Sequence, residues 1–365
     1  MSRQSFWLLA ALAGAALFAA FGLRPAGREA ATPATVQVFA AELAARLDKI
    51  EQVRLIKAGN QTVVTLERTG QDWRVAERHG YPADVERLRT LLRGLAEARV
   101  LEAKTSSAEW YERLGVEDVA GNQAKGLLLE VSGGGEPWRV IIGQAGAQGG
   151  HYVRRPEDKQ SWLIALDASP ASELKSWLAP QILDIAAERV REVQVEGDDG
   201  FRLLRQADAG DATFKLEPMP EGRELAYPGA AAQPARTLTN LRLDDVLPAA
   251  EAGEPDAASL RRVRYLTRDG LVLQVEGWQK DGRHLARFQV SAEPADGQEG
   301  AAVKAEAEQL TQRLRDWVYV LPSYTQDNLL ARLDSLLAPA KEAQTSSEPA
   351  PASAETPAAP ADGGS

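Results

Sequence analysis

The chain has 365 residues, no cysteine and a formal net charge of -10 at pH 7. The lack of cysteine excludes disulfide bonds, thiolate nucleophiles and cysteine-based zinc sites, so apolar burial must stabilise the fold. The negative charge disfavours nucleic acid as a partner, because binding a phosphate backbone requires clustered lysine and arginine.

An uncharged run rich in alanine and leucine extends from Phe6 to Leu23. Its length reaches the roughly 17 to 25 residues that a helix needs to span a bilayer. We therefore expect residues 1–24 to form a single-pass inner-membrane anchor and residues 25–40 to form a spacer, with the globular part in the periplasm. The alternative is a signal peptide cleaved after the small-x-small pattern Ala20-Phe21-Gly22.

Beyond the spacer, short strands alternate with turns. The first strands are predicted over residues 53–57, 62–68 and 73–76. Their short connections indicate antiparallel neighbours. A helix is predicted after Tyr81-Pro82, because leucines recur there at three- and four-residue spacing and form an apolar stripe suited to covering a sheet. Further strands are predicted over residues 127–131, 138–142, 151–155 and 162–166, followed by a closing helix.

Parts of this pattern recur later in the chain in the same order. The matched segments are Ile50, Val53 and Leu55 with Val190, Val193 and Val195, Trp73–Val75 with Phe214–Leu216, Val100–Ala103 with Val246–Ala249, Gly126–Val131 with Gly270–Val275, His151–Arg154 with His284–Arg287, and Leu174 and Trp177 with Leu314 and Trp317. The period is too long for a solenoid repeat and indicates a duplicated domain. The predicted fold is therefore α+β, with an N-terminal transmembrane helix and two tandem, internally duplicated modules, residues 41–180 and 181–338, each an antiparallel sheet covered by helices.

Residues 339–365 consist almost wholly of alanine, proline, serine, glutamate, threonine and glycine, without an aromatic residue. Such a segment cannot bury enough apolar surface to offset its ordering entropy. We expect a disordered tail.

Several framework patterns resemble a known bacterial family. They are Val63–Arg68 leading to Trp73–Val75, Pro82–Asp84 before the leucine-rich helix, Trp110–Val116, Ile141–Gly143 and His151–Arg154. On these patterns the chain resembles the membrane-anchored domain of unknown function 4340 family over residues 50–337. The resemblance implies a periplasmic or cell-surface accessory protein, since members are often encoded beside ABC transporter and gliding-motility-type auxiliary proteins. It implies no catalytic residue.

Chemical motifs are scarce in the sequence. Four glycines between residues 143 and 150 link two predicted strands, whereas a dinucleotide-binding loop must open a helix, so a hairpin is predicted. The three histidines have no second ligand at metal spacing, and we expect no metal or cofactor. Asp244 and Asp245 are adjacent, whereas a glycosidase sets two carboxylates across its substrate, so we interpret them as capping or solvent-facing residues at the end of a helical stretch.

A His-x-x-Arg pattern occurs in both copies, as His151 with Arg154 and as His284 with Arg287. One interpretation is a pair of anion-binding surfaces. The other is a structural strand inherited by both copies, which needs no ligand.

Basic and aromatic residues in the second copy supply further candidates for interaction. Arg262 and Arg264 belong to a run that alternates with apolar residues, which predicts a strand edge with a basic side. That side is either a solvated face that discourages edge pairing or a docking site for an acidic partner or a lipid headgroup. Near the end of the folded region, Tyr319 and Tyr324 are interface candidates, because aromatic residues are enriched at binding hot spots.

These observations predict a non-enzymatic, membrane-tethered periplasmic accessory or scaffold protein. Its expected partners are ABC-type transporter or gliding-motility-type auxiliary subunits. Two alternatives stay open, namely a soluble periplasmic ligand-binding protein after signal cleavage and an envelope hydrolase with unidentified carboxylates. A deep cleft lined by acids would favour the hydrolase, an apolar or basic cleft the binding protein, and a flat aromatic patch the scaffold.

Overall fold

The computed structural model describes residues 37–206, 213–255, 257–293 and 298–339. The chain divides into two compact units between Ala179 and Pro180. The module boundary predicted from the sequence lies one residue later, between residues 180 and 181. The predicted anchor at Phe6–Leu23 and residues 340–365 of the predicted tail lie outside the described residues. Within the described ranges, no helix combines the length and apolar character needed to cross a membrane.

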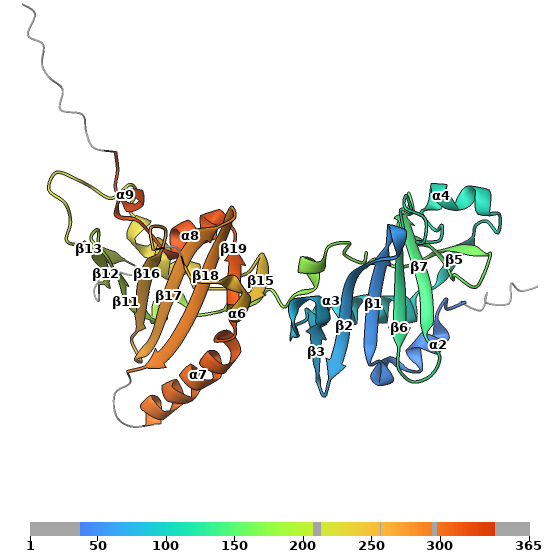
Figure 1. The fold of residues 1–365 in the computed structure, drawn as a ribbon, viewed down its shortest axis with the longest axis horizontal. Helices are drawn as coiled ribbons and strands as arrows, with labels where there is room; N and C mark the ends of the chain where they lie inside the picture. Colours follow the sequence, from blue (N-terminus) through green and yellow to red (C-terminus); the bar gives the residue numbers. More distant parts are fainter. Residues whose placement is uncertain (1–36, 207–212, 256, 294–297, 340–365) are drawn as a thin grey trace, which may run out of the picture. The chain divides into compact units, whose positions relative to one another are not determined.

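Unit 1 is built on a nine-stranded antiparallel sheet in the order β4-β3-β2-β1-β6-β7-β8-β9-β5 (Figure 1). Its strands are β1 (Gln52–Lys57), β2 (Gln61–Thr69), β3 (Asp72–Val75), β4 (Tyr81–Pro82), β5 (Val100–Ala103), β6 (Leu127–Ser132), β7 (Trp138–Ala145), β8 (His151–Arg154) and β9 (Ser161–Ile164). Its α-helices are α2 (Ala41–Ala44), α3 (Val85–Glu97) and α4 (Tyr111–Leu114), with short 3-10 turns at Leu47–Lys49, Ala58–Asn60, Ala76–Arg78, Ala108–Trp110 and Leu174–Trp177.

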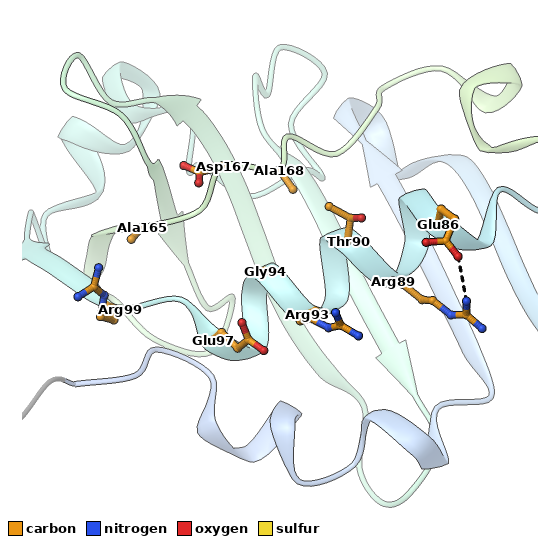
Figure 2. Close-up of a pocket in the computed structure, with 10 residues that line it drawn as sticks. All are labelled: Glu86, Arg89, Thr90, Arg93, Gly94, Glu97, Arg99, Ala165, Asp167 and Ala168. Atoms are coloured by element: carbon orange, nitrogen blue, oxygen red, sulfur yellow. Dashed lines mark hydrogen bonds and ion pairs between the residues drawn. The ribbon is translucent and has the colours of Figure 1, made fainter.

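Helix α3 forms where the leucine periodicity predicts it. The carboxylate of Asp84 caps its first turn by accepting a hydrogen bond from the Arg87 amide at 3.0 Å. Its apolar stripe is buried at Leu88, Leu91 and Leu95, and the helix lies across one face of the sheet (Figure 2). The core of unit 1 lies beneath this helix. Burial of each leucine side chain of the stripe contributes about 1.5–3 kcal/mol to folding.

The segment from α4 to Val116 crosses the sheet at two glycines. A Cβ atom at Gly126 would lie 2.3 Å from the Gly115 carbonyl oxygen, and one at Gly143 would lie 2.3 Å from that of Leu114. Gly115 itself turns the chain with a φ of 69°, which suits a residue without a side chain. The Trp110–Val116 pattern therefore serves close packing of a loop on the sheet.

Unit 2 is built on an eight-stranded antiparallel sheet in the order β13-β12-β11-β16-β17-β18-β19-β15 (Figure 1). Its strands are β11 (Val190–Val195), β12 (Phe201–Arg205), β13 (Phe214–Glu217), β15 (Asp245–Pro248), β16 (Arg261–Thr267), β17 (Leu271–Lys280), β18 (Arg283–Ala292) and β19 (Trp317–Leu321), while β10 (Gln181–Leu183) and β14 (Leu241–Arg242) form a separate pair. Its helices are α5 (Gln233–Thr237), α6 (Ala249–Ala252), α7 (Gln298–Leu314), α8 (Ser323–Leu329) and α9 (Leu333–Leu336), with 3-10 turns at Ala187–Arg189 and Ala230–Ala232. Helix α7 packs against β17 and β18. The expected mixture of helices with large antiparallel sheets is thus confirmed.

The two sheets share one strand order once β4 is set aside. In each unit the first strand (β1 or β11) lies in the interior and the next two continue toward one edge. The chain then crosses to the opposite edge (β5 or β15) and fills the positions between. By this order β6 corresponds to β16, and β7 to β17.

Two of the sequence matches join positions that are not equivalent in the sheets. The sequence pattern matches Gly126–Val131 with Gly270–Val275, but the first contributes β6 and the second contributes β17, whose counterpart is β7. Trp177 lies in a 3-10 turn, whereas its proposed match Trp317 lies in β19. Apolar strands have similar local patterns, so the neighbouring strand gave an equally good match.

Three further expectations need correction. The closing helix of the first module is only the short 3-10 turn at Leu174–Trp177. Asp244 and Asp245 do not end a helix, because they follow β14 and Asp245 begins β15. Arg262 and Arg264 do not lie on a strand edge, because β16 pairs with β11 on one side and β17 on the other.

Candidate functional site

Each unit carries an open groove beside the helix that precedes its far edge strand. In unit 1 this α3 groove has a volume of about 690 Å³ (Figure 2). It is lined by Glu86, Arg89, Thr90, Arg93, Gly94, Glu97, Arg99, Ala165, Asp167 and Ala168. The helical residues stand away from the leucine stripe, and Ala165–Ala168 belong to the segment that follows β9.

Gly94 sets how closely that segment approaches α3. A Cβ atom at this position would lie 3.0 Å from Cδ1 of Leu166, which is buried. The missing side chain therefore allows Leu166 to pack against the helix.

The charges that line the α3 groove are balanced in number, three arginines against three carboxylates. Glu86 and Arg89 form an exposed ion pair at 2.9 Å, drawn as a dashed line in Figure 2. The side chains of Arg93, Arg99 and Asp167 are exposed and have no ion-pair partner among the described residues. The local field in this groove is therefore mixed in sign.

In unit 2 the corresponding groove lies between the α5 region and α8, with a volume of about 440 Å³. We call it the Tyr324 groove. It is lined by Gln233, Arg236, Thr237, Thr239, Asn240, Leu241, Arg242, Leu243, Pro322, Tyr324, Thr325 and Asn328. Tyr324 is 70% exposed, and none of the described residues that line the groove is a carboxylate.

Hydrogen bonds fix much of the wall of the Tyr324 groove. Thr237 donates from Oγ1 to the Gln233 carbonyl at 2.9 Å. Thr239 donates to the Ile185 carbonyl at 3.2 Å, and the Asn240 side-chain oxygen accepts from Gln181 at 3.3 Å. By contrast, the exposed side chains of Arg236 and Arg242 have no ion-pair partner within the described residues.

Helix α8, which carries Tyr324, is held by a buried glutamine. Gln326 is 5% exposed and donates to the carbonyls of Leu285, at 2.8 Å, and Trp278, at 3.3 Å. Its side-chain oxygen accepts a hydrogen bond from Nδ1 of His284 at 2.8 Å. The position of Tyr324 therefore depends on contacts of α8 with β17 and β18.

The two grooves use equivalent positions of the chain. With one constant sequence offset, lining residues of the α3 groove correspond to lining residues of the Tyr324 groove. The pairs are Thr90 with Gln233, Arg93 with Arg236, Gly94 with Thr237, Glu97 with Asn240, and Arg99 with Arg242. At the same offset, buried residues also correspond, namely Leu88 with Ala231, Leu91 with Pro234, Leu92 with Ala235, Leu95 with Leu238, and Ala98 with Leu241.

Sequence reasoning missed this correspondence, although a signal was present. Leu178-Ala179-Pro180 recurs as Leu337-Ala338-Pro339. In the structure, Leu178 forms a β-bridge with Ala83, and Leu337 forms one with Leu225, just before the groove helix in each case. This repeated tripeptide could have indicated that the two units correspond, although its offset of 159 residues differs from the 143 residues between the groove positions.

The predicted residues His151 and Arg154 lie inside unit 1. His151 is 7% exposed, donates from Nδ1 to the Leu166 carbonyl at 2.9 Å, and has Nε2 2.6 Å from Ser169 Oγ. Arg154 is 3% exposed and donates to the Val116 carbonyl at 2.8 Å and to Asp118 at 2.6 Å. Both side chains are used within the unit, so neither presents an open anion site.

Their counterparts in unit 2, His284 and Arg287, are half-buried and contact different partners. His284 contacts Gln326, as described above, whereas Arg287 donates to Glu276, at 3.0 Å from its Nε. Glu276 also accepts a hydrogen bond from Arg262 at 2.9 Å. Arg262, Glu276 and Arg287 thus form a row across the neighbouring strands β16, β17 and β18. Burial raises the pKa of Glu276, but hydrogen bonds from Arg287 and Arg262 outweigh it and hold that pKa below its usual value.

The remaining candidates separate into a core residue and surface residues. Tyr319 is 1% exposed and packs edge-on against Phe288 with ring centroids 5.6 Å apart, so it is not a surface anchor. Arg264 donates to Glu293 at 2.8 Å. Tyr324 alone among the predicted residues lines one of the two grooves. Among the described residues, no group of histidine, aspartate and glutamate could hold a metal ion.

Comparison with known families identifies one match. The family model described as Domain of unknown function (DUF4340) matches residues 73–263. This range includes the whole lining of the α3 groove and the α5 side of the Tyr324 groove. No curated protein and no solved structure matches the chain.

Proposed function

The chain belongs to the Domain of unknown function (DUF4340) family, and from this membership we propose that it is a non-enzymatic accessory or scaffold protein of an ABC-type transport assembly in the cell envelope. The sequence resembles this family over residues 50–337, and the family model matches residues 73–263 of that range. The resemblance over the matched residues supports the proposal. The proposed partners are ABC-type transporter or gliding-motility-type auxiliary subunits.

In this proposal Phe6–Leu23 anchors the protein in the inner membrane and the two units lie in the periplasm. The support is the length and apolar character of that run. Tethering raises the effective concentration of both units near a membrane-embedded partner, so individual contacts can be weak.

We further propose that the two units arose by duplication. The shared strand order and the constant offset between groove residues both support it. Two independent folds would have no reason to place Arg93 and Arg236, and then Arg99 and Arg242, at the same spacing in equivalent grooves.

One observation carries the functional proposal. Each unit presents an open groove with exposed arginine side chains that have no ion-pair partner among the described residues. A glycosidase site would set two carboxylates across a substrate, about 5–10 Å apart, whereas no described residue that lines the Tyr324 groove is a carboxylate. The Tyr324 groove combines arginine and an exposed tyrosine, residue types enriched in protein-binding hot spots.

The test is purification of the native protein from detergent-extracted membranes, with the N-terminus sequenced from the same sample. Co-purification of ABC transporter subunits with a chain that retains Phe6–Leu23 is the expected result. A chain without partners that begins near Gly22 would overturn the proposal and favour the soluble ligand-binding alternative.

A further inference from the structure

We propose that the Tyr324 groove binds an acidic, extended peptide segment of a partner protein, whose carboxylates pair with Arg236 and Arg242. The inference rests on the proposed scaffold function and names the chemistry that the site recognises. The α3 groove, by contrast, is not selective for acidic peptides.

The charges of the two linings carry this distinction. Both grooves hold the equivalent arginine pair, but Glu86, Glu97 and Asp167 line only the α3 groove. The position of Glu97 is occupied by Asn240 in unit 2, so the described lining of the Tyr324 groove carries positive charge and no carboxylate. The nearby carboxylate of Asp184 accepts a hydrogen bond from the Asn240 amide at 3.0 Å. Guanidinium groups bind carboxylates through paired, charge-assisted hydrogen bonds, and these two are free to do so.

Uncharged groups in the groove suit the backbone of a peptide. Gln233 and Asn328 carry side-chain amides without a hydrogen-bond partner among the described residues. A primary amide donates and accepts at once, as a peptide unit does. These amides can therefore pair with the N–H and C=O groups of an extended chain.

Tyr324 supplies the apolar part of the contact. Tyr324 is 70% exposed on α8 and lines the groove together with Pro322 and residues of the α5 region. A tyrosine offers a large contact area at small conformational cost. The volume of about 440 Å³ falls within the roughly 300–1,000 Å³ range of ligand sites.

The wall is preorganised, which lowers the cost of binding. Thr237, Thr239 and Asn240 are fixed by hydrogen bonds to the rest of unit 2, and α8 is held by Gln326. The side chains of the two arginines, Gln233, Asn328 and Tyr324 must become ordered when a ligand enters.

The experiment measures fluorescence anisotropy of labelled eight-residue peptides with the full-length protein in detergent micelles. One peptide alternates glutamate with alanine and serine, and its matched control has glutamine in place of each glutamate. We expect binding of the acidic peptide to be at least about tenfold tighter, because carboxylates pair with the two guanidinium groups through charge-assisted hydrogen bonds, which are stronger than those of neutral amides.

Two double variants locate the site. Arg236→Gln with Arg242→Gln should weaken acidic-peptide binding at least about tenfold, whereas the equivalent change in unit 1, Arg93→Gln with Arg99→Gln, should change it less than about twofold. Tyr324→Ala should weaken binding of the peptide, and Tyr324→Phe should retain it. Circular dichroism of each variant confirms that the fold is intact.

Equal affinity for both peptides, equal loss in both double variants, or no peptide binding would overturn the inference. Binding of an anionic oligosaccharide through Arg236 and Arg242, without binding of the acidic peptide, would also overturn it. The outcome is separable from that of the scaffold proposal. Peptide binding without co-purifying transporter subunits would reject the transporter proposal and support the peptide site. Co-purifying subunits without peptide binding would reject only the peptide site.

Discussion

His284 in β18 donates a hydrogen bond from Nδ1 to the buried side-chain oxygen of Gln326 in α8, at 2.8 Å. Gln326 in turn donates to the carbonyls of Leu285 and Trp278. A single side chain thus connects the strand that bears His284 with the helix that bears Tyr324.

Gln326→Leu should destabilise the protein by about 2–3 kcal/mol, because it removes the hydrogen bonds of a buried amide with the Leu285 and Trp278 carbonyls and with His284. Urea unfolding measures the change. Asp327→Asn, an exposed change in the same helix, should have an effect below about 0.5 kcal/mol. An unaltered unfolding midpoint in Gln326→Leu would mean that α8 is held by other contacts.

Arg154→Gln should destabilise the protein by about 3 kcal/mol, since it removes a buried cation that bonds several acceptors. The guanidinium group contacts Val116 and Asp118 and stacks over the Tyr111 ring at 4.5 Å. Arg139→Gln, which breaks an exposed pair with Glu157, should cost less than about 1 kcal/mol. Similar losses in both variants, measured by urea unfolding, would contradict a special role for Arg154.

Gly143→Ala should destabilise the protein by about 2–4 kcal/mol, because the added methyl group overlaps the Leu114 carbonyl and forces the crossing loop away. Gly121→Ala is the matched control, since its Cβ atom would lie 3.5 Å from the Asp118 carbonyl, an ordinary contact. Thermal unfolding compares the two. Equal melting temperatures would show that the loop moves at little cost.

Glu276 makes stability depend on pH at the acidic end. Its pKa in the folded protein lies below the unfolded value of about 4.3, so its contribution is present above that pH and is lost as pH falls through the folded pKa. Glu276→Gln should therefore be less stable than the parent at pH 6, and the difference should shrink on acidification. Unfolding free energies between pH 6 and pH 2 measure this. A difference that stays constant across this range would contradict the linkage.

Local patterns predicted the elements of the fold well but not their neighbours. Helix α3 followed from leucine spacing, because an amphipathic stripe identifies both the helix and its buried face. The alternation of Arg262 and Arg264 with apolar residues identified a half-buried strand. It could not distinguish an edge from the interior, since that depends on which strands pair with β16.

The candidate site was harder to predict because it joins distant segments. The α5 region and α8 pack directly against each other, although strands β14 to β19 separate them in the chain, so no local motif marks their groove. Tyr319 and Tyr324 looked alike as nearby aromatics, yet one lies in a buried strand and the other on an exposed helix. To distinguish the buried Tyr319 from the exposed Tyr324, one must know that β19 ends at Leu321, between them.

The junction between the units has a practical consequence. The Ala179 amide donates to Pro82 within unit 1 at 2.9 Å, and the Pro180 carbonyl accepts from Leu243 within unit 2 at 2.9 Å. Adjacent residues therefore complete the hydrogen bonding of different halves, without intervening linker residues. A protein engineer could divide the gene at this peptide bond and leave each sheet with all of its own strands.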